Sequence, residues 1–405
     1  MRYAKKILLL GGAYSQIPVI QEARRHGWYV ITCDYLPDNP GHKYADEYYN
    51  VSTTDVEGVL RLAEKIKPDF VITYASDPAA PTAAYVSEKL GLPGNPYRSI
   101  QLLSDKYLFR ELLRENGFNT PRVLVTEWRE PSKINGISID YPVVVKPVDS
   151  SGSKGVSVVN TFGELNHAVG HALSFSLSER VIIEEYIDAE NGDLHGDGFF
   201  LNGELVFCLL GDHHYNNEVN PVNPAGTSWP SVEQASFLGE IKRQVESIAR
   251  NAGYMNGPVN IEARITGEGN IYIMEIGPRS GGHFVPQAIY HATGFDMVKA
   301  QLDILIQLPV EVPTFNVIPT SYYALHSKNA GYYGGCEIIE NIEPYIVEQH
   351  FYVERGARVR SFDSSSAALG ILILAFPDID LQQDVMSQAH NNYNIIIDRS
   401  EAVVS

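Results

Sequence analysis

Two glutamates in the segment from Asn260 to Gly277 are placed for chemistry by the register of a predicted hairpin. If residues 267–270 form a four-residue loop, Glu262 lies directly opposite Glu275 on the neighbouring strand. The side chains of directly opposite residues start about 5 Å apart, and two carboxylates at that distance repel unless a cation lies between them. Hard oxygen ligands on rigid strands suit Mg²⁺ that also holds substrate phosphates.

The same register predicts that the other face of the hairpin is wholly apolar. It is built from three pairs, Ile261 with Ile276, Ala263 with Met274 and Ile265 with Tyr272. The alternative to a metal site is a solvated strand face on which Arg264 neutralises the two carboxylates. The register rests on the assumed loop length, so both interpretations stay open.

Lys146 stands among apolar residues of a predicted strand, where an unpaired buried cation would be costly. We therefore expect an anion as its partner. The loop that follows, residues 150–155, offers backbone N–H groups and little side-chain bulk, so it could close over a polyphosphate. It is not a P-loop, because Lys154-Gly155 leads into a strand rather than a helix. By itself, a Ser- and Gly-rich hairpin loop is more often a plain turn.

Two further cations belong to the same interpretation. Lys106 falls in the first turn of a helix predicted over residues 105–116, with Ser104 as its N-cap. The helix dipole disfavours a cation there by some tenths of a kcal/mol, and a bound phosphate would reverse that sign. Arg279 follows the carboxylate hairpin directly, so it is carried beside any metal held there. A guanidinium in that place can stabilise charge on a phosphoryl or acyl-phosphate group.

Other polar residues are more ambiguous. Glu184 and Glu185 end a predicted strand with acidic groups, and an ordinary strand end is the alternative interpretation. His213 and His214 are adjacent, so they point to opposite faces of a strand and at most one enters the same site. A surface position is the default expectation for both histidines.

The elements that must position these residues begin with a βαβ pattern. Residues 1 to about 95 alternate strands and helices, which implies a parallel sheet. The predicted strands cover residues 6–10, 28–33 and 70–73, and the helices cover residues 16–26 and 56–66. Gly11, Gly12 and Asp34 invite a dinucleotide interpretation, but the full G-x-G-x-x-G fingerprint is absent. A Rossmann-like fold without a bound dinucleotide is therefore favoured.

The rest of the chain mixes strands with three long helical segments, and it contains no internal repeat. Helices are predicted over residues 105–116, 234–251 and 286–307. Strands are predicted over residues 143–147, 156–159, 181–185, 198–210, 322–326 and 368–376, besides the hairpin of residues 259–276.

Composition excludes several classes of protein. Lys and Arg number 31 against 49 Asp and Glu, so the net charge of −18, without any cationic run, argues against a dedicated nucleic-acid binder. The three cysteines lack paired spacing, which predicts neither a disulfide framework nor a zinc site and favours a reduced, cytoplasmic setting. The longest apolar run, residues 367–376, is about half of a membrane-spanning helix. The apolar stretch after Lys6 is too short for a signal peptide.

Taken in order, Lys106, Lys146 with its loop, the Glu184–Ile187 segment, the two hairpin glutamates and Arg279 resemble the ATP-grasp superfamily. The resemblance covers roughly residues 1–310 and extends to carboxylate-amine ligases of the L-amino acid ligase and carbamoyl phosphate synthetase-like group. It implies an α/β protein with three parts: a Rossmann-like pre-ATP-grasp domain at residues 1–100, an ATP-grasp α+β domain at residues 101–310 with a lid at residues 143–187, and a strand-rich segment at residues 311–405 that completes the lid or the substrate pocket.

The resemblance also implies roles for individual residues. Lys106 and Lys146 are expected to hold the ATP phosphates, and a loop with Ser151, Gly152, Ser153 and Gly155 is expected to cover them. Glu184 would accept a hydrogen bond from the adenine amino group, and the Glu185-Tyr186-Ile187 segment would contact adenine through the backbone of Glu185 and Ile187. Asp193 would bind the ribose. Glu262 and Glu275 would ligate Mg²⁺, and Arg279 would stabilise an acyl phosphate. Many members have Asn where Gly277 stands, which leaves the third metal ligand in doubt, and Asn260, opposite Gly277, could substitute.

The function that the resemblance implies is that of a cytoplasmic, ADP-forming ligase dependent on ATP and Mg²⁺. A substrate carboxylate becomes an acyl phosphate, which an amine captures. The expected partners are these small molecules, not nucleic acid or membrane, and a homodimer is left open. The alternatives are a carboxylase-type or purine-biosynthetic ATP-grasp enzyme that uses bicarbonate or a ribonucleotide, a dinucleotide-binding oxidoreductase, and a regulatory nucleotide-binding module without chemistry. The sequence does not identify the carboxylate or the amine.

Overall fold

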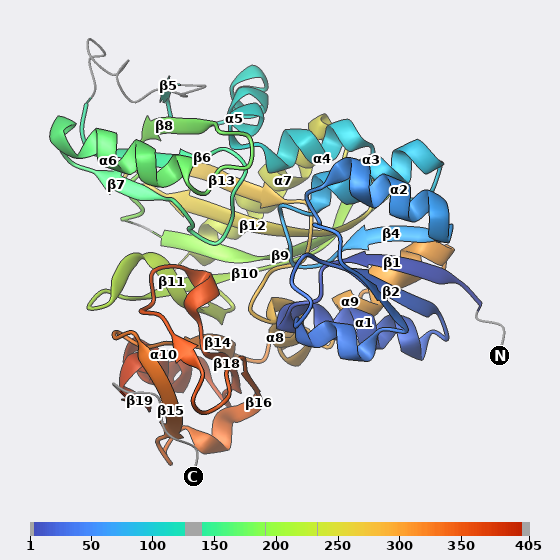
Figure 1. The fold of residues 1–405 in the computed structure, drawn as a ribbon. Coiled ribbons are helices and arrows are strands. Elements are labelled where there is room, and N and C mark those ends of the chain that lie inside the picture. Colours follow the sequence, from blue (N-terminus) through green and yellow to red (C-terminus); the bar gives the residue numbers. More distant parts are fainter. Residues whose placement is uncertain (1–3, 126–139, 191, 233, 399–405) are drawn as a thin grey trace.

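The computed structural model describes residues 4–125, 140–190, 192–232 and 234–398, and the parts of the predicted ranges that fall between or beyond these lie outside the described residues. The described strands form four sheets, which Figure 1 shows as three lobes around one long sheet. The first lobe holds the N-terminal sheet, the second a smaller sheet above the long one, and the third the C-terminal strands. The predicted α/β architecture is confirmed.

The N-terminal sheet is parallel, with strand order β3-β2-β1-β4. Its strands are β1 (Lys6–Leu10), β2 (Tyr29–Cys33), β3 (Glu47–Tyr49) and β4 (Phe70–Thr73), and its helices are α1 (Ile17–Arg25), α2 (Val56–Ile66) and α3 (Ala80–Leu90). The run of apolar residues in β1 follows from burial on both faces, because Ile7 and Leu9 enter one hydrophobic cluster while Leu8 and Leu10 enter another.

The turn after β1 is filled by the chain itself. Gly11 has a φ of +116°, and a side chain there would overlap the amide of Gln16, which donates to the Tyr74 carbonyl at 3.0 Å. A side chain at Gly12 would overlap the ring of His42. The side chains of Gln16 and His42 therefore fill the space next to the glycines that a dinucleotide pyrophosphate would need, which disfavours the dinucleotide alternative.

A second unit carries the predicted lid. Helices α4 (Tyr97–Ser104) and α5 (Lys106–Glu115) lead to an antiparallel sheet of order β5-β8-β6-β7, and α6 (Phe162–Leu173) packs on that sheet. Its strands are β5 (Val123–Val125), β6 (Val143–Pro147), β7 (Ser157–Val159) and β8 (Val181–Glu185). The predicted N-cap of α5 is wrong by one residue, because the Asp105 carboxylate, not Ser104, accepts from the N–H groups of Tyr107 and Leu108.

The long sheet has eight strands in the order β13-β12-β9-β10-β11-β14-β18-β16, and so it runs on into the C-terminal segment. Helix α7 (Ala235–Ala252) contacts β10 and β13 and shares their hydrophobic cluster. The strands are β9 (Gly192–Leu201), β10 (Glu204–Asn216), β11 (Asn220–Trp229), β12 (Gly257–Ile265), β13 (Ile271–Gly277), β14 (Thr320–Leu325), β16 (Ile346–Phe351) and β18 (Gly370–Ala375).

Most of the remaining elements lie in the lower part of the molecule in Figure 1, but the helix Met297–Asp303 packs against α1 of the N-terminal lobe. They are α8 (Val285–Thr293), α9 (Met297–Asp303), α10 (Ile379–Ser387) and a small sheet of β15 (Gly331–Ile338), β17 (Arg358–Val359) and β19 (Tyr393–Asp398). No helix within the described ranges combines the length and the apolar composition that crossing a membrane requires.

Two predicted elements are wrong because a turn was overlooked. The single strand over residues 198–210 is instead the β9–β10 hairpin, since Asn202 and Gly203 both have positive φ, 52° and 82°, and make a two-residue turn. The single helix over residues 286–307 is two helices, because Gly294 ends α8 in the left-handed conformation at a φ of +76°.

Candidate active site

The hairpin of β12 and β13 places Glu262 directly opposite Glu275, as predicted, and Asn260 opposite Gly277. Beyond this point the predicted register is wrong. A bulge shifts the pairing, so that Ala263 lies opposite Ile273 and the loop spans five residues, 266–270. The core pairs therefore contain isoleucines, and the predicted core residues Met274 and Tyr272 are only half-buried.

Lys106 lies next to the two glutamates. Its Nζ is 3.2 Å from Glu275 Oε2 and donates to the Ser150 carbonyl at 2.8 Å. Burial alone would lower the pKa of Lys106, but the charges of Glu275 and Asp77 outweigh burial and raise that pKa. The Glu262 carboxylate reaches solvent, yet partial desolvation and then the Glu275 charge raise its pKa to about 7. The pair of carboxylates therefore favours an additional cation.

A row of polar residues on β9 lies beside this pair. In the register of β9 and β12, Asp193 is opposite Arg264, His195 is opposite Glu262, and Asp197 is opposite Asn260. Alternating positions of neighbouring strands share one face, so these side chains line the same surface of the long sheet. The Asp193 carboxylate accepts from Tyr215 at 2.6 Å and from Arg264 at 3.2 Å. Its proposed contact with ribose stays a prediction.

Lys146 has its anionic partner within the protein. The Glu184 carboxylate is completely buried and forms an ion pair with Lys146, while Arg110 donates to it at 2.9 and 3.3 Å. Burial would raise the pKa of Glu184, but Arg110 and then Lys146 lower it to about 2. Burial lowers the pKa of Lys146 to about 8 against the opposing effect of Glu184. The sequence argument that Lys146 lacks a partner other than a ligand is therefore wrong.

Arg110 is a residue that sequence reasoning missed. It lies four residues after Lys106, on the same face of α5, and this spacing was the available signal. Its Nη1 also donates to the Met274 carbonyl at 2.8 Å, which ties α5 to the carboxylate hairpin. Since Glu184 already meets two cations, its expected contact with the adenine amino group stays a prediction.

Arg279 is held by Asp77, which follows β4 of the N-terminal sheet. The two side chains pair in a bidentate manner, Nε to Oδ1 at 2.7 Å and Nη2 to Oδ2 at 2.5 Å. Burial would raise the pKa of Asp77, but the charge of Arg279 outweighs it and lowers that pKa, with further help from Lys106 and the Ser151 hydroxyl. Sequence reasoning missed Asp77, although the carboxyl end of a parallel strand is a usual place for a site residue.

The loop of residues 150–155 joins β6 to β7 beside this ion pair. Gly152, Ser153 and Gly155 all have positive φ, between 58° and 73°. The Gly152 carbonyl accepts from the Ser365 N–H at 3.4 Å and from its hydroxyl at 3.2 Å. A residue of the C-terminal segment thus holds the loop that was predicted to cover ATP.

The predicted adenine segment lies at the end of β8. Glu185 has an exposed side chain, and its N–H donates to the Arg122 carbonyl at 3.0 Å. The Ile187 carbonyl accepts from Arg264 at 3.0 Å, and the Arg264 guanidinium lies 5.9 Å from the centre of the Tyr186 ring. Arg264 therefore links this segment to Asp193 by hydrogen bonds, while the charge of Asp193 and, less strongly, that of Glu262 raise its pKa against the effect of burial. The solvated-face alternative stays open.

A histidine cluster adjoins the glutamates. His195 stacks on His213 with ring centres 4.7 Å apart, and its two ring nitrogens contact Thr227 Oγ1 at 3.1 Å and the Asn260 amide nitrogen at 2.9 Å. Burial lowers the pKa of both histidines, so both are neutral at pH 7. The expected surface position is wrong for both His213 and His214, because neither ring is exposed.

The Asn260 side chain is committed to this network. Its amide nitrogen also lies 2.8 Å from Asp197, a buried carboxylate whose pKa is raised to about 6 by burial and which accepts from the Gly281 N–H at 2.8 and 3.1 Å. Asp197 thus fixes the segment that follows Arg279. No set of three His, Cys, Asp or Glu side chains in the described ranges is arranged to hold a metal, so the third ligand stays open.

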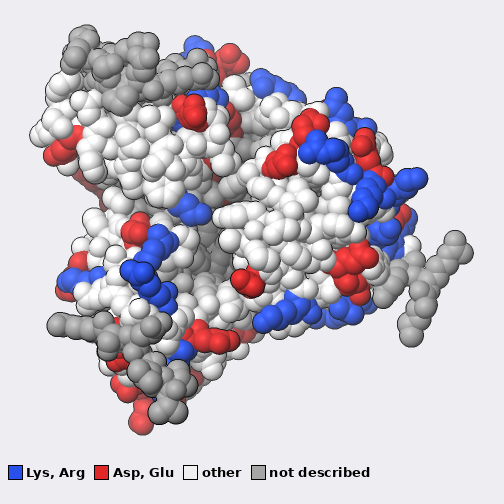
Figure 2. Space-filling view, viewed as in Figure 1, with Lys and Arg blue, Asp and Glu red and all other residues white. Residues whose placement is uncertain are grey.

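The face in Figure 2 carries a hollow between the N-terminal lobe, the smaller sheet and the C-terminal strands, over β9 and β10 of Figure 1. Basic and acidic side chains are interspersed around it, without a broad cationic surface. The described site residues thus come from all three lobes: Asp77 from the first, Lys146 and Glu184 from the second, and Ser365 from the third.

Comparison with known proteins identifies an ATP-grasp domain in the middle of the chain. Residues 139–287 match the model of the ATP-grasp domain. A formate-dependent phosphoribosylglycinamide formyltransferase of Bacteroides thetaiotaomicron is 28% identical over 286 residues, which are 68% of this chain and 70% of that protein. A carbamoyl phosphate synthase large chain of Thermoanaerobacter sp. is 28% identical over 62% of this chain and 23% of its own length.

Solved structures of the same fold cover nearly the whole chain. An L-amino acid ligase from Bacillus licheniformis superimposes with a TM-score of 0.83 at 20% identity, over 98% of this chain and all of that chain. An N5-carboxyaminoimidazole ribonucleotide synthetase from Thermotoga maritima gives a TM-score of 0.74 at 19% identity, over 97% of this chain and all of that chain. The chain therefore contains an ATP-grasp domain, as the sequence predicted, and its overall fold is that of the ligase and synthetase structures named above.

Proposed function

We propose that this enzyme is an ADP-forming ligase that joins a small carboxylate to an amine. A carboxylate oxygen forms a bond to the γ-phosphorus of ATP as the bond to the β-phosphate oxygen breaks, which releases ADP. The amine then attacks the acyl carbon, phosphate leaves, and the amine loses a proton. The observation that carries the proposal is the pairing of Glu262 with Glu275 beside two cations, since Lys106 forms an ion pair with Glu275 and the Glu275 charge also acts on Arg279.

The two glutamates fit Mg²⁺, because two directly opposed carboxylates favour a hard divalent cation between them, and desolvation together with the Glu275 charge raises the pKa of Glu262 to about 7 in the absence of a metal. When bound with ATP, Mg²⁺ would neutralise charge on the phosphates as the phosphoryl group transfers. Glu262 and Glu275 would be its protein ligands. Solved structures of related fold include complexes with ADP and with MgADP, which supports this assignment.

The cations of the chain would position the anionic groups. Lys106 and Lys146 would hold phosphate oxygens, and the loop of residues 150–155 would exclude water over them. Arg279 would stabilise charge on the acyl phosphate, and Asp77 would hold its guanidinium in place through the bidentate pair. Glu184, the Glu185-Tyr186-Ile187 segment and Asp193 are the proposed contacts for the nucleoside.

A purine-biosynthetic reaction is the second candidate, because formate-dependent phosphoribosylglycinamide formyltransferases are 28% identical over about two thirds of this chain. Such a reaction shares the same first step, with formate as the carboxylate. The partners proposed for either case are small molecules. A homodimer and a cytoplasmic setting stay predictions.

Purified protein with ATP and Mg²⁺ tests the proposal. Amino acids and small acids are screened in pairs for ADP and phosphate release, and the joined product is identified by mass spectrometry. We expect ADP, phosphate and product in equal amounts for one class of pair, and no release by the Glu275→Gln variant. Formate with glycinamide ribonucleotide as the only productive pair would favour the second candidate. ATP bound without ADP release by any pair would contradict both.

A further inference from the structure

The segment from Arg279 to His283 leads from the carboxylate hairpin towards α8, and it ends in strained backbone. His283 and Phe284 are successive non-glycine residues with φ values of +52° and +59°. A bulky side chain is costly in this left-handed region, and such backbone persists only where surrounding contacts impose it, which is frequent at functional sites. The two residues therefore each need a physical reason.

Contacts from β16 explain the backbone of Phe284. Its ring is buried and stacks on the His350 ring, with the ring centres 3.7 Å apart. His350 Nε2 lies 2.8 Å from one oxygen of Glu348, and the other oxygen of Glu348 lies 2.7 Å from Nε2 of His291 on α8. Packing does not explain His283 in the same way, because its side chain is only half-buried.

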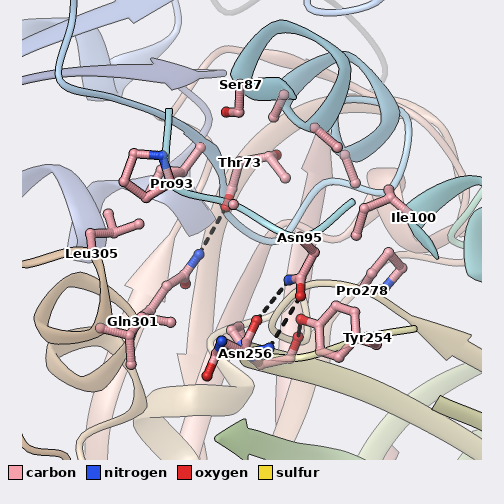
Figure 3. Close-up of a pocket in the computed structure, with 18 of the residues that line it drawn as sticks. Thr73, Ser87, Pro93, Asn95, Ile100, Tyr254, Asn256, Pro278, Gln301 and Leu305 are labelled. Carbon is pink, nitrogen blue, oxygen red and sulfur yellow. Dashed lines mark hydrogen bonds between the residues drawn. The ribbon is translucent and has the colours of Figure 1, made fainter. Parts of the chain in front are cut away.

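The residue before this segment belongs to a different environment. Pro278 lies in the wall of a cavity of about 600 Å³ between the N-terminal sheet and the long sheet, and Figure 3 shows this wall with Tyr254 and Gln301. None of the described residues that line the cavity is charged, and none of residues 279–283 lines it. The ionisable groups of the segment therefore lie outside this cavity.

The nitrogens of the His283 ring are free, unlike those of the other histidines of the site. The ring stacks on Tyr322 of β14 with the ring centres 5.8 Å apart. Neither nitrogen makes a hydrogen bond within the described ranges, and neither is one of the enclosed polar atoms without a partner, so both reach solvent. Both nitrogens of His195 are engaged, as is one nitrogen each of His213 and His214.

Tyr322 and His195 place His283 on the cleft face of the long sheet. Their rings lie 6.5 Å apart, and His195 is opposite Glu262 in the sheet. After burial, the charge of Glu262 contributes to the rise of the Tyr322 pKa to about 12. Positive charge on Arg279 or His283 acts on His195 and, after the larger effect of burial, lowers its pKa. Arg279 and His283 therefore face the same part of the cleft.

The His283 imidazole is neutral at pH 7 and offers a lone pair, because burial lowers its pKa to about 4. The proposed ligase reaction needs a proton acceptor, since the amine must lose a proton to become an amide nitrogen. The attacking nitrogen carries positive charge once the C–N bond forms, and it is then acidic enough to protonate a weak base. Negative charge on the acyl phosphate would raise the pKa of His283 towards neutrality, where proton transfer is most effective.

The carboxylates of the cleft are engaged elsewhere, as proposed metal ligands, in ion pairs with arginines or by complete burial. They are, in that order, Glu262 and Glu275, Asp77 and Asp193, and Asp197. His283 offers what these groups lack, an uncharged acceptor that is open to the cleft.

We propose that His283 accepts the proton of the attacking amine, an assignment that rests on the proposed function. The amine lone pair forms the C–N bond to the acyl carbon, and the bond between that carbon and the phosphate oxygen breaks, so phosphate leaves with the electron pair. An N–H proton moves to a ring nitrogen of His283, and its bonding pair stays on the amide nitrogen. The imidazolium then returns the proton through solvent to the phosphate, and His283 is neutral again.

Hydroxylamine separates the two halves of the reaction, because it is largely unprotonated at pH 7 and captures acyl phosphates as hydroxamates without a base. Each acid that is active in the screen is incubated with ATP, Mg²⁺ and either hydroxylamine or its partner amine. His283→Asn suits the left-handed backbone but removes the imidazole. We expect its hydroxamate formation to stay within about threefold of the parent and its amide formation to fall at least about 100-fold, so that ADP release exceeds amide formation.

Two further variants assign the effect to the imidazole. His283→Gly leaves space for free imidazole, which should restore amide formation at least about tenfold. The matched control is His214→Asn, since His214 lies on the opposite face of β10 from His213 and contacts Ser228 at 2.7 Å, and both of its rates should equal those of the parent.

Two results would overturn the role of His283 while the proposed function stands. One is parental amide formation by His283→Asn. The other is equal loss of hydroxamate and amide by the folded variant, which would assign His283 a structural role. Absence of hydroxamate from the parent with every acid of the screen would refute the proposed function itself, and the role of His283 with it.

Discussion

Glu262 lies directly opposite Glu275 on the neighbouring strand, and the Lys106 ammonium group lies 3.2 Å from Glu275 Oε2. The two carboxylates repel each other in the metal-free protein, where desolvation and then the Glu275 charge raise the pKa of Glu262 to about 7 in spite of the opposing charge of Lys106. The same repulsion becomes attraction when a divalent cation binds between the carboxylates. Removal of one charge must therefore have opposite effects in the two states.

We expect Glu275→Gln to keep or slightly raise the melting temperature of the metal-free protein, because loss of the repulsion from Glu262 offsets loss of the partly buried ion pair to Lys106. The variant should lose the stabilisation that Mg²⁺ with ATP gives the parent, and it should lose turnover. Differential scanning fluorimetry with and without Mg²⁺-ATP measures both. The control is Glu268→Gln in the loop of the same hairpin, which should behave as the parent. Full stabilisation of the Glu275→Gln protein by Mg²⁺-ATP would reject the metal assignment.

Arg279→Lys tests the bidentate pair with Asp77. A lysine cannot reproduce two parallel hydrogen bonds to one carboxylate, so we expect stability to fall by about 1–2 kcal/mol and turnover to fall at least 100-fold. ATP affinity should change less than threefold, since the role proposed for Arg279 is on the acyl phosphate. Arg264→Lys is the matched comparison, because Arg264 holds Ile187 and Asp193 of the proposed nucleoside site, and it should weaken ATP binding instead. A loss of ATP affinity in the Arg279 variant with unchanged kcat would reverse these two roles.

The position of Glu262 opposite Glu275 was predicted from a four-residue loop, whereas the structure has a five-residue loop and a bulge between Glu262 and Ala263, and these two differences cancel at this pair. The bulge could not be predicted, since one extra residue in a strand leaves no mark on composition. The Asn202-Gly203 turn is different, because its signal was present in the sequence and was overlooked. The parallel N-terminal sheet was predictable from its alternating elements and from apolar runs that need burial on both faces.

The ion pairs of the site could not be predicted, because each joins residues far apart in the chain. Arg110 and Glu184 are 74 residues apart, and Asp77 and Arg279 are 202 apart. Sequence patterns report local periodicity, and they identified Lys146 as a buried cation without identifying its partner. A bound anion was expected for this reason, and the structure supplies Glu184 instead.

The pKa of Lys146 gives a pH dependence. Burial lowers that pKa from 10.5 to about 8 in the folded protein, so between these values the unfolded chain holds a proton that the folded chain has lost. The contribution of Lys146 to the free energy of unfolding therefore rises as the pH increases from about 8 to 10.5. ATP affinity should do the reverse and fall about tenfold between about pH 7 and pH 9, as Lys146 loses its charge. Isothermal titration at several pH values measures this fall, and Lys146→Arg, which stays protonated, should show a flatter profile.

Lys146→Ala is the companion test, and its outcome depends on Arg110. We expect ATP affinity to fall at least tenfold while the protein stays folded, because Arg110 still neutralises Glu184. Arg110→Met should instead destabilise the protein by about 3 kcal/mol, since Arg110 donates most of the hydrogen bonds to the buried carboxylate. Urea unfolding with circular dichroism separates the two effects. A folded Lys146→Ala protein with the parent's ATP affinity would remove Lys146 from the site.

The contact between Ser365 and Gly152 gives the final prediction. Gly152 has a φ of +65°, and a side chain there would overlap the Ser365 hydroxyl, so Gly152→Ala should weaken ATP binding through both backbone strain and displacement of Ser365. In the Ser365→Ala background the overlap is relieved but the strain remains, and the loss of affinity should be smaller.

Ser365→Ala alone removes the hydroxyl bond to the Gly152 carbonyl, and it should raise hydrogen exchange of residues 150–155 in the ATP-free protein. ATP should restore protection in the parent and in this variant, because the closed loop would then be held by phosphate oxygens. Equal exchange of the loop with and without ATP in the parent would show that it is not a lid.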